Sequence, residues 1–583
     1  LNSCRNFRFI ETLLASDHRS RLLMVCHSKL SFGVVASGLY AVVSTLSAPA
    51  KPDRPQVHFT SEKGWINDPN GLVHYGGLYH LFFQHNPFGK AWGEMSWGHA
   101  VSSDMLQWKQ LRTALPCDAS KFVFSGSAVV DKNNSAGFQT AGGRPVLVIA
   151  YTSMDRKKGF SEQRLAFSSD GNKFSKVGAI IPHTQGVDAA ARDPRVLWHA
   201  ESHTWCLVLW MHPGIVGFFK SKDLKVWERS QELTFVGGDR RVGNSGHAWP
   251  GGFECPDLFP LRDSSGLNHW VLWSANGAYL LGNFDGLRFK PHGPPLLSEY
   301  GAGYAAQTFS NEPRNRRIQI SWLRPLASGE WESEPFTGQM TFPVELDLIK
   351  LASGELRVRR LPISELTALR QTHVWSSGHQ PPKWPITATL PAGAAVELRA
   401  ELQLHLGSHV VLTLPGIDVI LKPGSVSCAH SVMPLEGASA INIHVLLDRH
   451  SIEIFDTAGG GSMAFYIDQR ASSNEMRLEV KNGSVQLTSL DVYALRSTSG
   501  TLSVSPGFPL RPQEKASVAY HKGRETSAVP MSLAVLVIAL LLTCAAASHV
   551  LRARVWRSTW KRGRAEHGGA GQQPQHIGAN PVE

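Results

Sequence analysis

The stretch SSDMLQW, residues 102–108, places an aspartate four residues before an aromatic side chain. The same pattern recurs as SSDGNKF (168–174), SKDLKVW (221–227) and NFDGLRF (283–289), with successive aspartates 66, 53 and 62 residues apart. Short runs rich in Val, Ile, Phe, Trp and Tyr separate these copies, and such runs favour β-strands. A period of this length predicts repeated units, each with room for about four short strands. We interpret the aspartates and aromatics as turn and packing residues of each unit.

A second series of motifs interleaves with the first, and each of its members begins a strand-like run. Its five members are NDPNGLV (Asp68), FSGSAVV (Ser125), RDPRVLW (Asp193), ECPDLFP (Glu254) and YAAQTFS (Tyr304). The steps between them are 57, 68, 61 and 50 residues. Five units of similar size predict a five-bladed β-propeller, which we assign to residues 56–345.

The composition changes after this region. Residues 356–495 contain alternating segments such as HVVLTL (409–414) and HSIEIF (450–455), which indicate strands with one buried face. We therefore predict an all-β fold in which a β-sandwich follows the propeller. Residues 496–527 are rich in Ser and Pro and are typical of a stalk.

Both ends of the chain carry apolar segments. Residues 528–547 form twenty uncharged positions, which predicts a transmembrane helix over 528–551 and a basic cytoplasmic tail over 552–583. Residues 1–50 read as an N-terminal extension with a signal peptide or, alternatively, an uncleaved signal anchor. Either alternative places the region between these segments outside the cytoplasm, in an extracellular or lumenal position, tethered by the C-terminal helix.

The charge lies mainly at these ends. The chain has 583 residues and a formal net charge of +11. Residues 1–29 carry +3 and residues 552–583 carry +4, so the remaining residues carry only +4. That distribution excludes a nucleic-acid partner. The seven cysteines show no CxxC spacing, so neither a metal site nor a dense disulfide framework is predicted, and no cofactor is expected.

The propeller model brings distant residues together. The first strand of each blade lines the central channel, so Asp68, Ser125, Asp193 and Glu254 are expected to share one pocket. Three carboxyl groups in one pocket cannot all be ionised without cost, so at least one should have a raised pKa. Such a group suits acid–base and nucleophilic chemistry.

Six segments together resemble glycoside hydrolase family 32, the family of invertases, inulinases, levanases and fructosyltransferases. They are WINDPNG (65–71), FFQHNP (82–87), WGEMSWGHA (92–100), FSGS (124–127), RDP (192–194) and ECPDL (254–258). The resemblance covers roughly residues 56–495 and implies a five-bladed propeller followed by a sandwich, in agreement with the repeat count.

The resemblance also implies roles for individual residues. Asp68 would be the nucleophile, Glu254 the acid/base and Asp193 the stabiliser of the transition state. A further group would surround the fructose subsite: Asn67, Gln84, Trp92, Phe124, Ser125 and Arg192.

The activity implied is the release of terminal β-D-fructofuranosyl units from sucrose or fructans such as inulin and levan, with retention and without metal or cofactor. Two alternatives remain open from the sequence: a fructosyltransferase, and a catalytically silent fructan-binding receptor on the same scaffold.

Overall fold

The computed structural model describes one compact unit of the chain. The described residues are 53–183, 187–212, 214–234, 254–325, 334–377, 383–435, 437, 439–467 and 473–498. The predicted N-terminal extension, transmembrane helix and basic tail, and all but the first residues of the predicted stalk, lie outside these ranges. Within them, no helix has both the length and the apolar character needed to span a membrane.

The first three β-sheets each contain four consecutive strands paired antiparallel in chain order, which we name blades 1, 2 and 3. Blade 1 contains β1 (Gly64–Tyr75), β2 (Leu78–Asn86), β3 (Ser96–Ser102) and β4 (Lys109–Leu115). Blade 2 contains β5 (Lys121–Asp131), β6 (Val146–Asp155), β7 (Ser161–Ser168) and β8 (Ser175–Ile181). Blade 3 contains β9 (Arg192–His199), β10 (Thr204–His212), β11 (Ile215–Ser221) and β12 (Glu228–Thr234).

Blades 4 and 5 carry small additional strands. Blade 4 contains β13 (Asp257–Arg262), β14 (Asn268–Trp273), β15 (Ala278–Phe284), β16 (Phe289–Pro291) and the short β17 (Leu296–Leu297). Blade 5 contains β19 (Gly303–Thr308), β20 (Arg317–Leu323), β22 (Gln339–Met340), β23 (Val344–Lys350) and β24 (Leu356–Pro362). The remaining short strand, β21 (Phe336–Thr337), pairs in parallel with β1 and so ties the end of the series back to its beginning.

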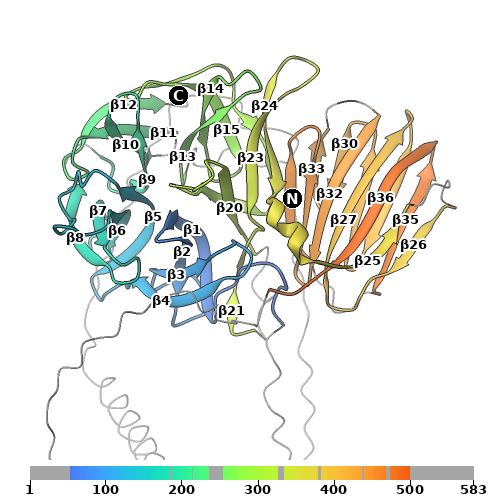
Figure 1. The fold of residues 1–583 in the computed structure, drawn as a ribbon, viewed down its shortest axis with the longest axis horizontal. Helices are drawn as coiled ribbons and strands as arrows, with labels where there is room; N and C mark the ends of the chain where they lie inside the picture. Colours follow the sequence, from blue (N-terminus) through green and yellow to red (C-terminus); the bar gives the residue numbers. More distant parts are fainter. Residues whose placement is uncertain are drawn as a thin grey trace, which may run out of the picture. The chain divides into compact units, whose positions relative to one another are not determined.

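The first strands of the five blades form a closed ring. Each of β1, β5, β9, β13 and β19 contacts the first strand of the blade before and after it, and β19 contacts β1. Figure 1 shows the five sheets arranged around a common centre, with these strands innermost. This arrangement fits the predicted five-bladed β-propeller.

The repeated aspartates close the hairpin between the third and fourth strand of blades 1 to 4. One carboxylate oxygen of Asp104 accepts hydrogen bonds from the backbone amides two and three residues further on. Asp170, Asp223 and Asp285 make the same pair of contacts. A short acceptor side chain that binds its own backbone in this way stabilises a turn, which confirms the structural interpretation of the repeat.

Two further sheets pack face to face and enclose an aliphatic core, as expected for a β-sandwich. The seven-stranded sheet contains β18 (Glu299–Gly301), β34 (Ser462–Tyr466), β33 (Ser451–Asp456), β32 (Ala440–Asp448), β27 (Ala395–Leu404), β36 (Val485–Leu495) and β25 (Arg370–Ser376). The six-stranded sheet contains β26 (Ile386–Thr389), β35 (Glu475–Asn482), β28 (His409–Leu414), β29 (Ile417–Lys422), β30 (Ser425–Cys428) and β31 (Ser431–Pro434). One 3₁₀ helix, η1 (Ser364–Leu369), precedes β25.

The boundary between the two regions differs from the predicted one at two strands. β24 begins at Leu356, where we expected the sandwich to begin, but it pairs with β23 as the outer strand of blade 5. β18, from within the propeller region, pairs with β34 of the sandwich. Alternation of apolar residues identifies a strand but not the sheet in which it pairs, so the sequence pattern could not resolve this exchange.

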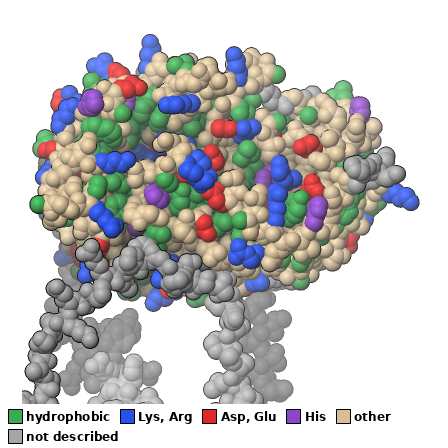
Figure 2. Space-filling model, viewed as in Figure 1, with side chains coloured by type: hydrophobic (Ala, Val, Ile, Leu, Met, Phe, Trp, Pro, Cys, Tyr) green, Lys and Arg blue, Asp and Glu red, His purple; other side chains and the backbone are tan. Residues whose placement is uncertain are grey.

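Charged side chains are dispersed over the body. On the face drawn in Figure 2, Lys and Arg side chains alternate with Asp and Glu and with uncharged groups, and no broad region of one sign is visible. This agrees with the small net charge of the central part of the sequence.

Candidate active site

The five residues that mark the second motif series lie on or just before the innermost strands, near their N-terminal ends. Asp68 lies on β1, Ser125 on β5, Asp193 on β9 and Tyr304 on β19, and Glu254 lies just before β13. Five strands far apart in the sequence thus bring their first residues to one end of the channel. Asp68, Ser125 and Asp193 line one pocket there.

Irregular backbone presents these side chains. The pairing of β1 with β2 shifts register across Asp68, and the pairing of β5 with β6 shifts across Ser125. Asp193 and Cys255 adopt left-handed backbone conformations, with φ of 65° and 49°. Bulges and left-handed non-glycine residues redirect side chains at a cost in local strain, and both concentrate at functional sites.

The Asp68 carboxylate is oriented by three donors. The Ser125 hydroxyl donates to Oδ2 at 2.6 Å, and the Asn67 amide donates to Oδ1 at 3.2 Å. Asn67 is itself fixed by the indole N–H of Trp65, 2.9 Å from its side-chain oxygen. The Cys255 thiol completes the set, 3.6 Å from Oδ2. Hydrogen bonds to a carboxylate favour its ionised form and hold it in one orientation.

Asp193 is buried beside this group. Its Oδ2 accepts hydrogen bonds from the backbone amide and the thiol of Cys255, at 3.3 and 3.4 Å. Its own backbone amide donates to the Thr152 hydroxyl at 3.0 Å. Both carboxylates therefore contact the same cysteine side chain, which places Asp68 and Asp193 next to each other.

Glu254 is held from two sides. Arg192 donates two hydrogen bonds to its Oε1, from Nε at 3.1 Å and Nη2 at 2.7 Å. The Tyr304 hydroxyl donates to Oε2 at 2.5 Å. The Arg192 guanidinium also stacks over Trp210, 3.9 Å from the ring centroid, and its Nε lies 3.8 Å from Asp193 Oδ2. Arg192 thus contacts both Asp193 and Glu254.

The electrostatics agree with the expectation of at least one raised pKa. Burial raises the pKa of Asp193 to about 7; the Arg192 charge opposes this shift, and the charges of Glu254 and Asp68 add to it. Burial also raises the pKa of Asp68. The hydrogen bond from Ser125 opposes this shift, and the charge of Glu254 adds to it. Asp68 and Asp193 therefore both hold their protons to a higher pH than ordinary aspartates, as expected for acidic residues buried beside one another.

Two further predicted residues, Trp92 and Gln84, have no direct contact with the three carboxylates among the described residues. Trp92, in the loop after β2, is 55% exposed and contacts Phe122 and Phe124 with ring centroids 5.9 and 6.0 Å apart. Phe122 and Phe124 are parallel, so the three rings form an apolar surface at the rim. Gln84 is buried on β2, and its amide nitrogen has no hydrogen-bond partner among the described residues. No contact joins Gln84 directly to the carboxylates, so its predicted role rests on the resemblance alone.

Two residues of the site have contacts that the sequence did not indicate. The sequence predicted no role for Cys255, but its thiol contacts both Asp68 and Asp193. Tyr304 marked only the start of the fifth blade, yet it binds Glu254. Both residues lie in motifs of the second series. Because the first strand of every blade faces the channel, their positions in these motifs could have indicated that they belong to the site.

Asp68, Asp193 and Cys255 also place three potential ligand atoms within 4.8 Å of one another, the one such group found among the described residues. Burial and then the neighbouring carboxylates hold the pKa of the Cys255 thiol well above its usual range. A metal-binding cysteine must be a thiolate, so this environment fits a protonated hydrogen-bond donor better than a metal ligand.

Comparisons with known proteins agree with this geometry. The model of the glycosyl hydrolases family 32 N-terminal domain matches residues 58–359. The levanase of Bacillus subtilis (strain 168) is 33% identical over 497 residues, covering 77% of this chain and 71% of the levanase. A sucrose-6-phosphate hydrolase of Zymomonas mobilis is 31% identical over 450 residues, covering 69% of this chain and 83% of that protein.

A solved structure matches across both regions of the fold. The exo-inulinase of Aspergillus awamori superposes with a TM-score of 0.68 at 25% identity, covering 78% of this chain and 100% of that one. With the family model matched over more than half of the chain and the acidic residues grouped at one end of the channel, the chain belongs to glycosyl hydrolase family 32 and is a glycosidase.

Proposed function

We propose that the protein is a retaining β-fructofuranosidase that releases terminal β-D-fructofuranosyl units from sucrose and from fructans. The observation that carries the proposal is the grouping of Asp68 on β1, Asp193 on β9 and Glu254 just before β13, each with its own hydrogen-bond partners. Relatives named levanase, exo-inulinase and sucrose-6-phosphate hydrolase support the substrate class.

In the first step Asp68 attacks the anomeric carbon of the fructosyl unit, and a bond forms between its oxygen and that carbon. The glycosidic bond breaks, and Glu254 gives its proton to the leaving oxygen. In the second step Glu254 takes a proton from water, whose oxygen attacks the same carbon and releases Asp68. Two displacements retain the configuration. Ser125 and Asn67 keep Asp68 aligned for both steps.

Asp193 stabilises the transition state in this scheme. Its buried carboxylate accepts hydrogen bonds from fructose hydroxyls, and such bonds strengthen as the ring becomes oxocarbenium-like. Arg192 holds Asp193 and Glu254 in fixed relative positions. The exposed ring of Trp92, with Phe122 and Phe124, gives an apolar surface for a sugar face.

The direct test is to incubate the purified protein with sucrose, inulin and levan and to measure free fructose. Release of fructose from at least one of them, with retention, is expected. Products longer than the substrate at high sucrose would indicate fructosyl transfer. The absence of any released fructose would contradict the proposal and favour a sugar-binding receptor.

We expect the Glu254→Ala variant to lose activity according to the leaving group. Sucrose hydrolysis should fall by about 10²- to 10⁴-fold, because its leaving oxygen needs a proton. An activated aryl β-fructofuranoside should lose much less in its first step, because its leaving group departs without one. Steady-state and pre-steady-state rates on both substrates measure the difference. Glu475→Ala, which removes an exposed glutamate on β35, is the control; equal losses on both substrates would contradict the role of Glu254.

We further propose that this region functions outside the cytoplasm, in an extracellular or lumenal position, tethered by residues 528–551. The support is the uncharged run at 528–547 and the basic residues that follow it. Protease treatment of intact cells that express an epitope at each end tests the arrangement. Cleavage of the enzyme region with protection of the C-terminal epitope is expected, and the reverse pattern would contradict it.

A further inference from the structure

A second cavity lies at the opposite end of the same inner strands. It has a volume of about 580 Å³, and its lining includes Val130 of β5, Trp198 of β9 and Phe259 of β13. Each of these residues follows its blade's active-site residue by five positions: Ser125, Asp193 and Glu254. At about 3.3 Å per strand residue, the cavity lies roughly 15 Å from the carboxylates along the channel. We name it the distal cavity.

One guanidinium in the distal cavity has a buried carboxylate as its ion-pair partner. Arg195 is 3% exposed, and its Nε lies 2.7 Å from Asp257 Oδ1, so the two form a buried ion pair. The Arg195 Nη atoms donate to the backbone oxygen and the hydroxyl of Thr308, at 3.2 and 3.0 Å. Asp257 therefore balances the charge of Arg195 and fixes its position.

The second guanidinium is not balanced in this way. Arg317, on β20, donates to the backbone oxygen of Phe309 at 3.3 Å and lies over the Phe259 ring at 5.4 Å. Its Nε is buried without a hydrogen-bond partner, and none of the described carboxylates forms an ion pair with it. Burial and then the charge of Arg195 lower the pKa of Arg317 to about 10, while the charges of Asp257 and Glu312 oppose this shift, so Arg317 stays protonated at neutral pH.

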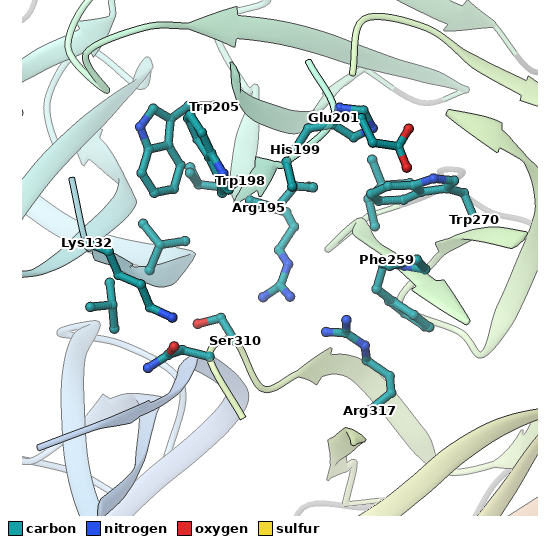
Figure 3. A pocket seen from close by; sticks show the side chains of 18 of the residues that line it. Lys132, Arg195, Trp198, His199, Glu201, Trp205, Phe259, Trp270, Ser310 and Arg317 are labelled. Carbon is teal, nitrogen blue, oxygen red and sulfur yellow. The ribbon is translucent and has the colours of Figure 1, made fainter. Parts of the chain in front are cut away.

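The cationic groups converge on one space. Figure 3 shows the guanidinium groups of Arg195 and Arg317 pointing toward each other across the distal cavity, with the ammonium group of Lys132 extending toward them. Among the described lining residues Glu201 is the one carboxylate, and it is exposed and directed away from the two guanidinium groups. Like charges in close, partly buried positions repel each other unless an anion lies between them.

The walls and the size of the distal cavity indicate which kind of ligand would fit between these cations. Trp198, Trp270 and Phe259 supply aromatic surface beside the cations. The volume lies within the range of small-molecule sites and exceeds what a lone inorganic ion fills. Paired guanidinium groups match the geometry of phosphate and carboxylate oxygens, and aromatic faces suit the C–H face of a sugar ring.

We propose that the distal cavity binds a small organic oxyanion, a sugar bearing a phosphate or carboxylate group, with the oxyanion between Arg195, Arg317 and Lys132. The aromatic side chains hold the organic part. This site is separate from the carboxylates, and it is independent of the proposed hydrolysis.

Isothermal titration calorimetry at neutral pH and low chloride tests the proposal with four probes: inorganic phosphate, glucose 6-phosphate, gluconate and glucose. We expect at least one sugar oxyanion to bind more tightly than inorganic phosphate, and neutral glucose to bind much more weakly. Comparison of glucose 6-phosphate with gluconate distinguishes a phosphate from a carboxylate ligand. Saturating fructose should leave the affinity unchanged, because it occupies the other end of the channel.

Variants of the distal cavity identify the site. Arg317→Gln should weaken binding at least about tenfold, and Arg317→Lys should also weaken it, because lysine lacks the forked donors. Arg288→Gln, which removes an exposed charge outside the cavity lining, is the matched control and should bind normally.

Melting temperatures verify folding, and Lys132→Gln, at an exposed position, gives a second test if Arg317→Gln does not fold. Lack of anion binding by the wild-type protein, unchanged affinity in the Arg317 and Lys132 variants, or displacement by fructose would overturn the proposal.

Discussion

The Asp68→Ala variant should lose about 10⁴-fold or more of kcat on sucrose, the largest catalytic effect expected for any single side chain of the site. Without the carboxylate no fructosyl–enzyme bond can form, and water alone must attack the anomeric carbon. The loss should appear in kcat, because the other residues proposed to contact the sugar, Asn67, Arg192 and Trp92 among them, stay in place. Steady-state kinetics measure it, and the melting temperature should not fall, since removing one of three clustered acidic groups relieves repulsion.

Azide distinguishes a lost nucleophile from a disturbed pocket. In Asp68→Ala, azide can enter the vacated space and attack the anomeric carbon from that side, while Glu254 protonates the leaving oxygen. The product should be a fructosyl azide of inverted configuration. Asp418→Ala, which removes an exposed aspartate of the sandwich, is the control and should keep full activity without forming this product. A retained azide product, or sucrose turnover near that of the wild type, would contradict the role of Asp68.

The second motif series predicted which residues of the active site lie close together. The second motif series marks the first strand of each blade, and the geometry of a propeller brings first strands together. The spacing predicted one pocket for Asp68, Ser125, Asp193 and Glu254. The first three line that pocket, and Arg192 links Glu254 to Asp193. Asn67 and Arg192 adjoin them in sequence, and the structure joins both to the cluster by hydrogen bonds.

Other contacts depend on details that spacing does not encode. The left-handed conformation at Cys255 turns its thiol toward Asp68 and Asp193, and nothing in the letters ECP specifies that direction. Whether Tyr304 faces the channel or the blade interior depends on the register shift between β19 and β20. A one-residue change of register would send that side chain to the opposite face.

The distal cavity could not be predicted from the sequence, for a different reason. Arg195 and Arg317 come from blades 3 and 5. Arg195 lies within RDPRVLW and Arg317 outside both motif series, and the sequence indicates a chemical role for neither of them. Their significance depends on which arginine has a carboxylate partner, and Asp257 satisfies only one of them. Pairing between side chains distant in sequence is a property of packing, which a single sequence does not display.

The junction between propeller and sandwich depends on another such pairing, centred on His58. The imidazole lies in the segment before β1, and both of its nitrogens contact acidic side chains of the sandwich: Nδ1 to Asp448 Oδ2 at 2.8 Å and Nε2 to Glu453 Oε1 at 2.7 Å. All three side chains are buried. Asp448 also accepts hydrogen bonds from the backbone amides of Gln56 and Val57, which anchors the whole segment.

The charge on His58 is stabilised by these partners. Burial lowers its pKa, but the hydrogen bonds and charges of Asp448 and Glu453 outweigh burial and raise the pKa from 6.5 to about 9. A shift of this size corresponds to roughly 3 kcal/mol of folding free energy. Because the pKa is raised in the folded state, the contribution is fully present below about pH 6.5 and is lost as the pH rises through 9.

We therefore expect His58→Ala to lower the free energy of unfolding by about 3–5 kcal/mol at pH 6, because two buried carboxylates lose their shared cationic partner. Urea unfolding of the wild type and the variant at pH 6, 7.5 and 9.5 measures this difference, which should shrink as the pH rises. His405→Ala, which truncates an exposed histidine of the sandwich, controls for the substitution itself and should follow the wild type at every pH. A difference that stays constant with pH would show that His58 contributes packing alone, since a neutral imidazole loses nothing when the solution becomes more basic.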